Sequence, residues 1–184
     1  MTSDAATIAA AEASASFKHA MRRLASGVCL VTTHESGLDH GFVASAVTSV
    51  SAEPPTLLVC INRTATSHDP LLRAGIFCVN VLTQAHEDLA RRFSRPEDRH
   101  LRFADRNWIR LISGAPVLED GLAGFDCQVE RTVSVATHTI VIGHVVATRT
   151  AGPVEPMVYI DGRFTAAASR GGFHPAFDFD RGWG

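Results

Sequence analysis

The chain has 184 residues, 46% of them hydrophobic and 20% charged, and its formal net charge is −2. This length suits one domain with a real core, and the composition is that of a soluble globular protein. The balanced charge excludes a nucleic-acid surface, which needs a basic excess, and the absence of an apolar run near about 20 residues excludes a membrane span.

The N-terminal segment 1–15 is rich in Ala and Ser and has no basic region of the kind that opens a secretory signal. We expect it to be a flexible or loosely helical tail, because small residues bury little area. Ser16 is then an expected N-cap for a helix that presents Phe17, Met21 and Leu24 on one face and ends before Gly27.

Most of the remaining chain is predicted to form strands. The expected strands are 28–33, 41–50, 56–61, 76–82, 125–135 and 138–150, with Gly143 as a bulge or close backbone approach, and a last hairpin of 157–160 and 163–165 across Asp161-Gly162. A polar loop, 62–74, leads into a short helix, Thr83 caps a helix over 84–93, and the charged segment 94–118 is expected to be irregular.

This order of elements predicts the architecture. About seven strands with tight turns and no βαβ alternation favour an antiparallel barrel in a mainly β domain over residues 16–168, followed by a C-terminal tail at 169–184. No GxGxxG follows a strand, so no Rossmann nucleotide site is expected.

The segment 41–55, GFVASAVTSVSAEPP, carries small and hydroxylic residues where a core strand would carry bulky ones. A strand with short side chains leaves room for a flat ligand against the backbone, and backbone N–H groups with Ser and Thr hydroxyls are good donors to phosphate and heterocyclic oxygens. A polar surface strand would show a similar composition. The segment is therefore a candidate ligand-binding strand and loop.

Together with the aliphatic strand 56–61 and with Phe77-Cys78-Val79-Asn80-Val81-Leu82, this motif resembles the short-chain flavin reductase family, over about residues 17–164. The resemblance implies an antiparallel split barrel of the FMN-binding type, a homodimer, and an NADH- or NADPH-dependent flavin oxidoreductase that uses FMN or FAD. It also implies a separate flavin-dependent monooxygenase that receives the reduced flavin by diffusion, all in the cytoplasm.

The resemblance further implies a set of flavin-binding residues on four segments of the chain. They are Thr32, Thr33, Ala44, Ser45, Ala46, Val47, Thr48, Ser49, Val50 and Ser51, then Asn62, Arg63 and Ser67 toward the flavin phosphate, and the backbone of Val79 and Asn80 as a pocket wall. Considered without the resemblance, an Asn such as Asn80 on an aliphatic strand is more often structural, because its amide must be satisfied.

His138 is the candidate for a direct part in hydride transfer. The family usually has Gly-Asp-His here, with the His beside the nicotinamide, whereas this chain has Ala136 and Thr137 before its histidine. The substitution changes the group available to hydrogen-bond the imidazole. A strand-end histidine on the surface is the alternative interpretation.

The other chemistry-bearing residues indicate no further site. The histidines show no HxH or HExxH spacing, so no metal site is expected. Four cysteines lie singly in apolar runs, as buried thiols in a reducing cytoplasm do. Two other functions fit the same barrel: a non-catalytic flavin-binding or electron-carrier protein, and a flavin oxidase similar to pyridoxamine-phosphate oxidase.

Overall fold

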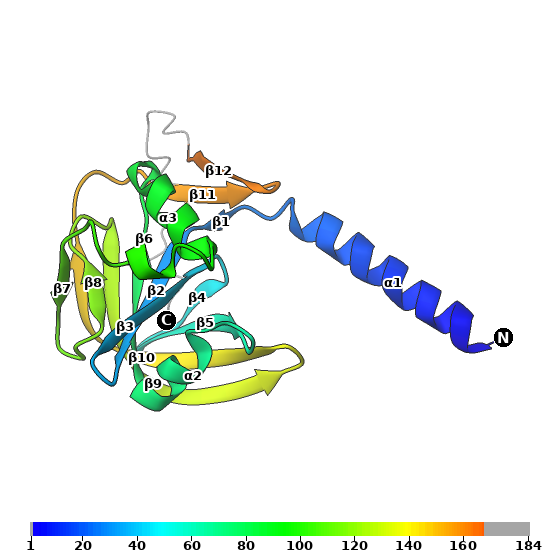
Figure 1. Cartoon of the computed structure of the whole chain (residues 1–184), viewed down its shortest axis with the longest axis horizontal. Helices are drawn as coiled ribbons and strands as arrows, with labels where there is room; N and C mark the ends of the chain where they lie inside the picture. Colours follow the sequence, from blue (N-terminus) through cyan, green and yellow to red (C-terminus); the bar gives the residue numbers. More distant parts are fainter. Residues whose placement is uncertain (1, 168–184) are drawn as a thin grey trace.

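The computed structural model describes residues 2–167, so the predicted tail at 169–184 lies outside the described residues. The first element, α1, is a helix over Thr2–Met21 that projects from the body of the molecule (Figure 1). It begins well before the predicted cap at Ser16, because the Ala-rich segment has high intrinsic helix propensity. It also ends before Gly27, which belongs to a short strand. Among residues 2–167, no helix is long and apolar enough to cross a bilayer.

A seven-stranded antiparallel sheet forms the body, in the order β3-β2-β6-β9-β10-β5-β4. Its strands are β2 Cys29–Glu35, β3 Leu38–Ala44, β4 Val47–Ala52, β5 Pro55–Asn62, β6 Ile76–Val81, β9 Ala123–Val135 and β10 His138–Thr150. The two outermost strands, β3 and β4, follow each other in the chain but are not hydrogen-bonded neighbours. The antiparallel barrel is therefore confirmed, and it is split between β3 and β4.

Two small sheets and short helices surround the barrel. One sheet contains β1 Ser26–Gly27, β11 Met157–Ile160 and β12 Arg163–Ala166, and the other contains β7 Trp108–Arg110 and β8 Pro116–Leu118. The helices are α2 His68–Ala74, which packs on β2 and β6, then η1 Gln84–His86, α3 Glu87–Ser94, which packs on β3, and η2 Arg99–Leu101. The expected cap at Thr83 is present as a capping box with His86.

Two predicted segments differ from the structure. The expected strand 41–50 is interrupted at Ser45 and Ala46, which separate β3 from β4. The charged segment 94–118, expected to be irregular, contains η2 and the β7–β8 hairpin. This hairpin has only three residues in each strand, which is too short for an alternating pattern to identify it.

Gly143 lies where β10 passes close to a buried aromatic ring, so no larger residue fits there. A Cβ atom on Gly143 would lie 2.5 Å from Cε1 and Cζ of Phe77, and the ladder between β9 and β10 shifts register beside it. Phe77 is fully buried, together with Val79 and Val141. The predicted bulge and close approach at Gly143 are both confirmed.

Candidate functional site

A cleft of about 580 Å³ opens beside the split of the barrel. Its lining comes from β3, β5, β10, α3, the β11–β12 hairpin and the connections next to β2, β3 and β5. The lining residues are Val28, Phe42, Val43, Ala44, Ser45, Ala46, Cys60, Asn62, Ala65, Phe93, Ser94, His138, Tyr159 and Phe164. The cleft thus brings together Ala44, Ser45, Ala46, Asn62 and His138 from the predicted set. A cavity of this size is within the range of small-molecule sites.

The interruption between β3 and β4 forms one wall of this cleft. Ser45 and Ala46 take part in neither ladder, so strand pairing does not use their N–H groups. Their side chains, like that of Ala44, are no larger than a hydroxymethyl group, so a flat ring can approach the backbone. This wall offers the donors and the space that the sequence predicted for the segment.

The adjacent wall combines the end of β5 with the start of β10, and the Cys60 N–H of β5 donates to the Ala46 carbonyl at 3.1 Å. His138 is the register partner of Asn62 across these strands. The side-chain oxygen of Asn62 accepts hydrogen bonds from the backbone N–H and the hydroxyl of Thr64, each at 2.9 Å. Asn62 therefore fixes the start of the loop that leads to α2, while the exposed imidazole of His138 lies beside the cleft.

A second pocket of about 230 Å³ adjoins the cleft and shares Phe42, Ala65 and Phe93 with it. Its other lining residues are mostly polar or basic: Gly41, Thr64, Thr66, Ser67, Pro96, Arg99 and Arg102. The two walls of this polar end are the 64–67 loop and the segment that contains η2. Hydroxyls opposite guanidinium groups are suited to an anion such as a phosphate.

Arg102 is the buried charge of this second pocket. Only 8% of the residue is exposed, and its guanidinium donates to the carbonyl oxygens of Gly41 at 3.1 Å and Arg95 at 3.2 Å. Burial lowers the pKa of Arg102, and its buried Nε has no hydrogen-bond partner among the described residues. A buried cation with an unused donor favours an anion nearby.

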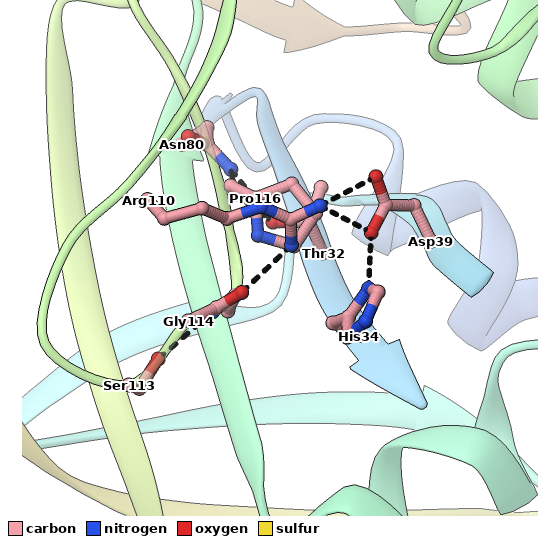
Figure 2. A network of polar contacts seen from close by, with 9 residues as sticks. Thr32, His34, Asp39, Asn80, Arg110, Ser113, Gly114 and Pro116 are labelled. Atoms are coloured by element: carbon pink, nitrogen blue, oxygen red, sulfur yellow. Dashed lines mark hydrogen bonds and ion pairs between the residues drawn. The ribbon is translucent and has the colours of Figure 1, made fainter. Parts of the chain in front are cut away.

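Four predicted flavin-binding residues do not reach the cleft. The Thr32 hydroxyl donates to the carbonyl oxygen of Pro116 at 2.5 Å, and that of Thr33 donates to Ile76 at 2.7 Å. Figure 2 shows Thr32 and Asn80 facing the β7–β8 hairpin. Asn80 donates to Thr32 Oγ1 at 3.1 Å and accepts from the Leu118 N–H at 2.7 Å.

These contacts give the side chains of Thr32, Thr33 and Asn80 structural partners, and none of the three residues lines the cleft, so their assignment to the flavin stays a prediction. Val79, the fourth, is fully buried in the main core cluster. The hydrogen bonds of Asn80 agree with the expectation that an amide on an aliphatic strand is structural.

The β4 residues are also outside the lining of the cleft. Thr48, Ser49 and Val50 are exposed, while Val47 packs on the core and Ser51 binds the backbone of Glu53 in the following turn. Ser67 lines the second pocket, where its hydroxyl donates to the Gly41 carbonyl at 3.0 Å. The exposed Arg63 lines neither hollow.

Sequence reasoning missed most of the aromatic and basic lining. Phe93, Tyr159 and Phe164 come from α3 and the β11–β12 hairpin, and Arg99 and Arg102 come from the segment that was expected to be irregular. The two arginines close to an aromatic residue in Arg99-His100-Leu101-Arg102-Phe103 were the available signal. In the described part of the chain, no three His, Cys, Asp or Glu side chains gather as a metal site would require.

Comparison with known proteins identifies the family. The protein-family model described as "Flavin reductase like domain" matches residues 21–168 of this chain. This chain belongs to the flavin reductase-like family. Its fold is the split barrel of the solved flavin reductases, as the resemblance of the 41–55 and 77–82 motifs implied.

Several relatives are named for their activity. The chain is 45% identical over 162 residues to an FMN reductase (NADH), RutF, of Methylorubrum populi, covering 87% of this chain and 80% of the relative. It is 42% identical over 150 residues to the FMN reductase (NADH) RutF 2 of Rhizobium rhizogenes, covering 82% and 87%.

Two solved structures share the architecture. BorF, the flavin reductase component of a bacterial two-component tryptophan halogenase, has a TM-score of 0.78 at 29% identity, covering 85% of this chain and 99% of BorF. The NADH:FAD oxidoreductase SgcE6 of Streptomyces globisporus C-1027, solved with NAD and FAD fragments, has a TM-score of 0.78 at 29% identity, covering 85% and 93%.

Proposed function

We propose that this chain is an NADH-dependent flavin reductase that binds flavin in the cleft beside the barrel split. The observation that supports this best is the position of the cleft: its walls are the small-residue segment Ala44–Ala46 and the end of β10 at His138. Relatives at 42–45% identity are named FMN reductase (NADH), which favours FMN over FAD and NADH over NADPH.

The residues present fit a flavin in size and in charge. The cleft has room for a flat ring against Ser45 and Ala46, and the adjoining pocket offers Thr64, Thr66 and Arg99 to a phosphate. We propose that the ring occupies the cleft and the phosphate the second pocket. This assigns the phosphate to Arg99 and Arg102 and not to Arg63.

A bound flavin supplies the electron chemistry: hydride from NADH and one proton convert FMN to its reduced form and release NAD⁺. The residues of the chain bind and orient the two molecules. The free N–H groups of Ser45 and Ala46 are donors for the polar edge of the ring, and His138 at the rim is placed to orient the nicotinamide. Ser45 and His138 are both exposed, so the ring can enter and leave without opening the core.

We further propose that the reduced flavin diffuses to a separate flavin-dependent monooxygenase in the cytoplasm. The support is the similarity to BorF, which is the reductase component of a two-component system. A product that leaves quickly also allows rapid turnover.

We also propose a homodimer. The edge strand β4 exposes half of Val50, and the β9–β10 hairpin, which extends beyond the rest of the barrel (Figure 1), exposes Val133 and Val135 by 41% and 50%. Exposed valines on a strand edge and hairpin are expected at an interface between copies. Light scattering at micromolar concentration should give twice the chain mass, and a monomer would contradict the proposal.

The activity is tested by mixing catalytic amounts of protein with FMN or FAD and with NADH or NADPH, and following loss of reduced-nicotinamide absorbance. We expect rapid oxidation in the presence of flavin, fastest with FMN and NADH. Flavin binding without nicotinamide oxidation would instead support the non-catalytic flavin carrier. Oxidation of a phosphorylated amine by the flavin-loaded protein would support the oxidase.

A further inference from the structure

The imidazole of His138 has a specific neighbour in the turn that precedes it. The Thr137 side-chain oxygen lies 2.8 Å from Nδ1 of His138. The turn is tight, because Ala136 has a φ of 48°, in the left-handed region. This hydroxyl occupies the position where the resembled family usually carries an aspartate.

The backbone on both sides of His138 is anchored to the loop that lines the cleft. The N–H of Arg63 donates to the Thr137 carbonyl at 2.9 Å. On the other side, Thr139 Oγ1 lies 2.9 Å from Nε2 of the buried His68, whose Nδ1 lies 2.6 Å from Asp69 Oδ1. These contacts fix the Cα atom of His138 relative to the cleft, and leave its ring free to rotate about the side-chain bonds.

We propose that Thr137 is a positioning residue that holds the His138 ring in one orientation for the nicotinamide; this inference rests on the proposed function. With Nδ1 bonded to Thr137, the ring nitrogen left for a ligand in the cleft is Nε2. An exposed imidazole without this bond would populate several rotamers, and only some of them would present Nε2 to the cleft.

Thr137 does this without adding a charge. An aspartate accepts hydrogen bonds only and carries a negative charge, whereas a hydroxyl can donate or accept. The contact therefore orients the ring without adding a carboxylate to the cleft lining, in which no Asp, Glu, Lys or Arg appears. Loss of the hydroxyl should change the reaction with NADH and leave FMN binding intact.

The test compares Thr137→Val, which keeps the branched shape and removes the hydroxyl, with Thr137→Ser, which keeps the hydroxyl. Thr148→Val, an exposed threonine on the far part of β10, is the matched control. We expect T137V to lower kcat/KM for NADH about threefold to tenfold, the size of one hydrogen bond, with the FMN Kd unchanged. T137S should restore most of the activity.

A double-mutant cycle separates positioning from a general effect on the fold. In a His138→Ala background, T137V should have no further effect on kcat/KM, because no ring remains to be oriented. An equal loss in both backgrounds, or wild-type kinetics in T137V, would overturn the inference.

The failure of this inference is distinguishable from failure of the proposed function. If the wild-type protein does not reduce flavin, the proposed function fails. If the wild-type protein reduces flavin, and H138A has a lower kcat/KM for NADH while T137V does not, only the role of Thr137 fails. Nitrogen NMR of histidine-labelled protein gives a readout independent of activity: T137V should shift the His138 ring signals and T148V should not, and unshifted signals in T137V would contradict the hydrogen bond.

Discussion

Gly143→Ala should strongly destabilise the protein, because the new methyl group has no space. Its Cβ would lie 2.5 Å from two ring carbons of Phe77 and 3.2 Å from Cβ of Cys127. Phe77 and Cys127 are fully buried on neighbouring strands, so neither can move toward solvent. Overpacking of a core costs about 1–3 kcal/mol, and we expect a loss near about 3 kcal/mol because two contacts are tight at once.

Urea unfolding measures this loss through the transition midpoint and slope. Gly27→Ala is the matched control, since its Cβ would have no heavy atom within 4 Å and should change the free energy of unfolding by no more than about 0.5 kcal/mol. Phe77→Leu combined with G143A should be less destabilising than the sum of the two single changes. A free energy of unfolding for G143A within about 0.5 kcal/mol of wild type would refute the close approach of β10 to Phe77.

Three further predictions follow from the site and the buried thiols. His138→Ala should lower kcat/KM for NADH about tenfold and leave the FMN Kd unchanged, and equal kinetics would remove His138 from the reaction. Arg99→Gln should weaken the binding of FMN about tenfold and leave the binding of riboflavin unchanged, while Arg63→Gln should change the affinity for neither. A loss of FMN affinity confined to R63Q would assign the phosphate contact to Arg63. Burial raises the pKa of Cys29 and Cys127 to about 12, from 9.0, so these thiols ionise more readily in the unfolded chain. The contribution of these thiols to stability should be constant below pH about 9 and fall by up to about 1.4 kcal/mol per thiol per pH unit toward pH about 12, and a urea midpoint that does not move over this range would contradict this burial.

Local chemistry allowed much of the fold to be predicted from the sequence. The bounds of β10, His138–Thr150, agree with the prediction because a tight turn precedes a long run rich in β-branched residues. The last hairpin also agrees, since Asp161 and Gly162 both have positive φ, as a two-residue turn requires. In both cases residues adjacent in the chain determine the element.

The differences arise where distant residues decide. The interruption at Ser45 and Ala46 contains no Gly or Pro to mark it, so the sequence predicted one strand where the structure has β3 and β4. Similarly, nothing near Thr32 in the chain shows that its hydroxyl faces Pro116, 84 positions away. The face that the Thr32 hydroxyl takes depends on the pairing of β2 with β6 and on its packing against β8.

The most direct test of the central claim is multiple-turnover reduction of FMN by NADH without oxygen, measured for the wild type and for Ala46→Trp. Ala46 lines the cleft, and an indole there would fill the space assigned to the flavin ring. We predict that catalytic amounts of wild-type protein bleach many equivalents of FMN and that A46W bleaches almost none. The urea midpoint of A46W should first show that the variant is folded. Full turnover by folded A46W would show that the cleft is not the flavin site, and no turnover by the wild type would contradict the reductase function itself.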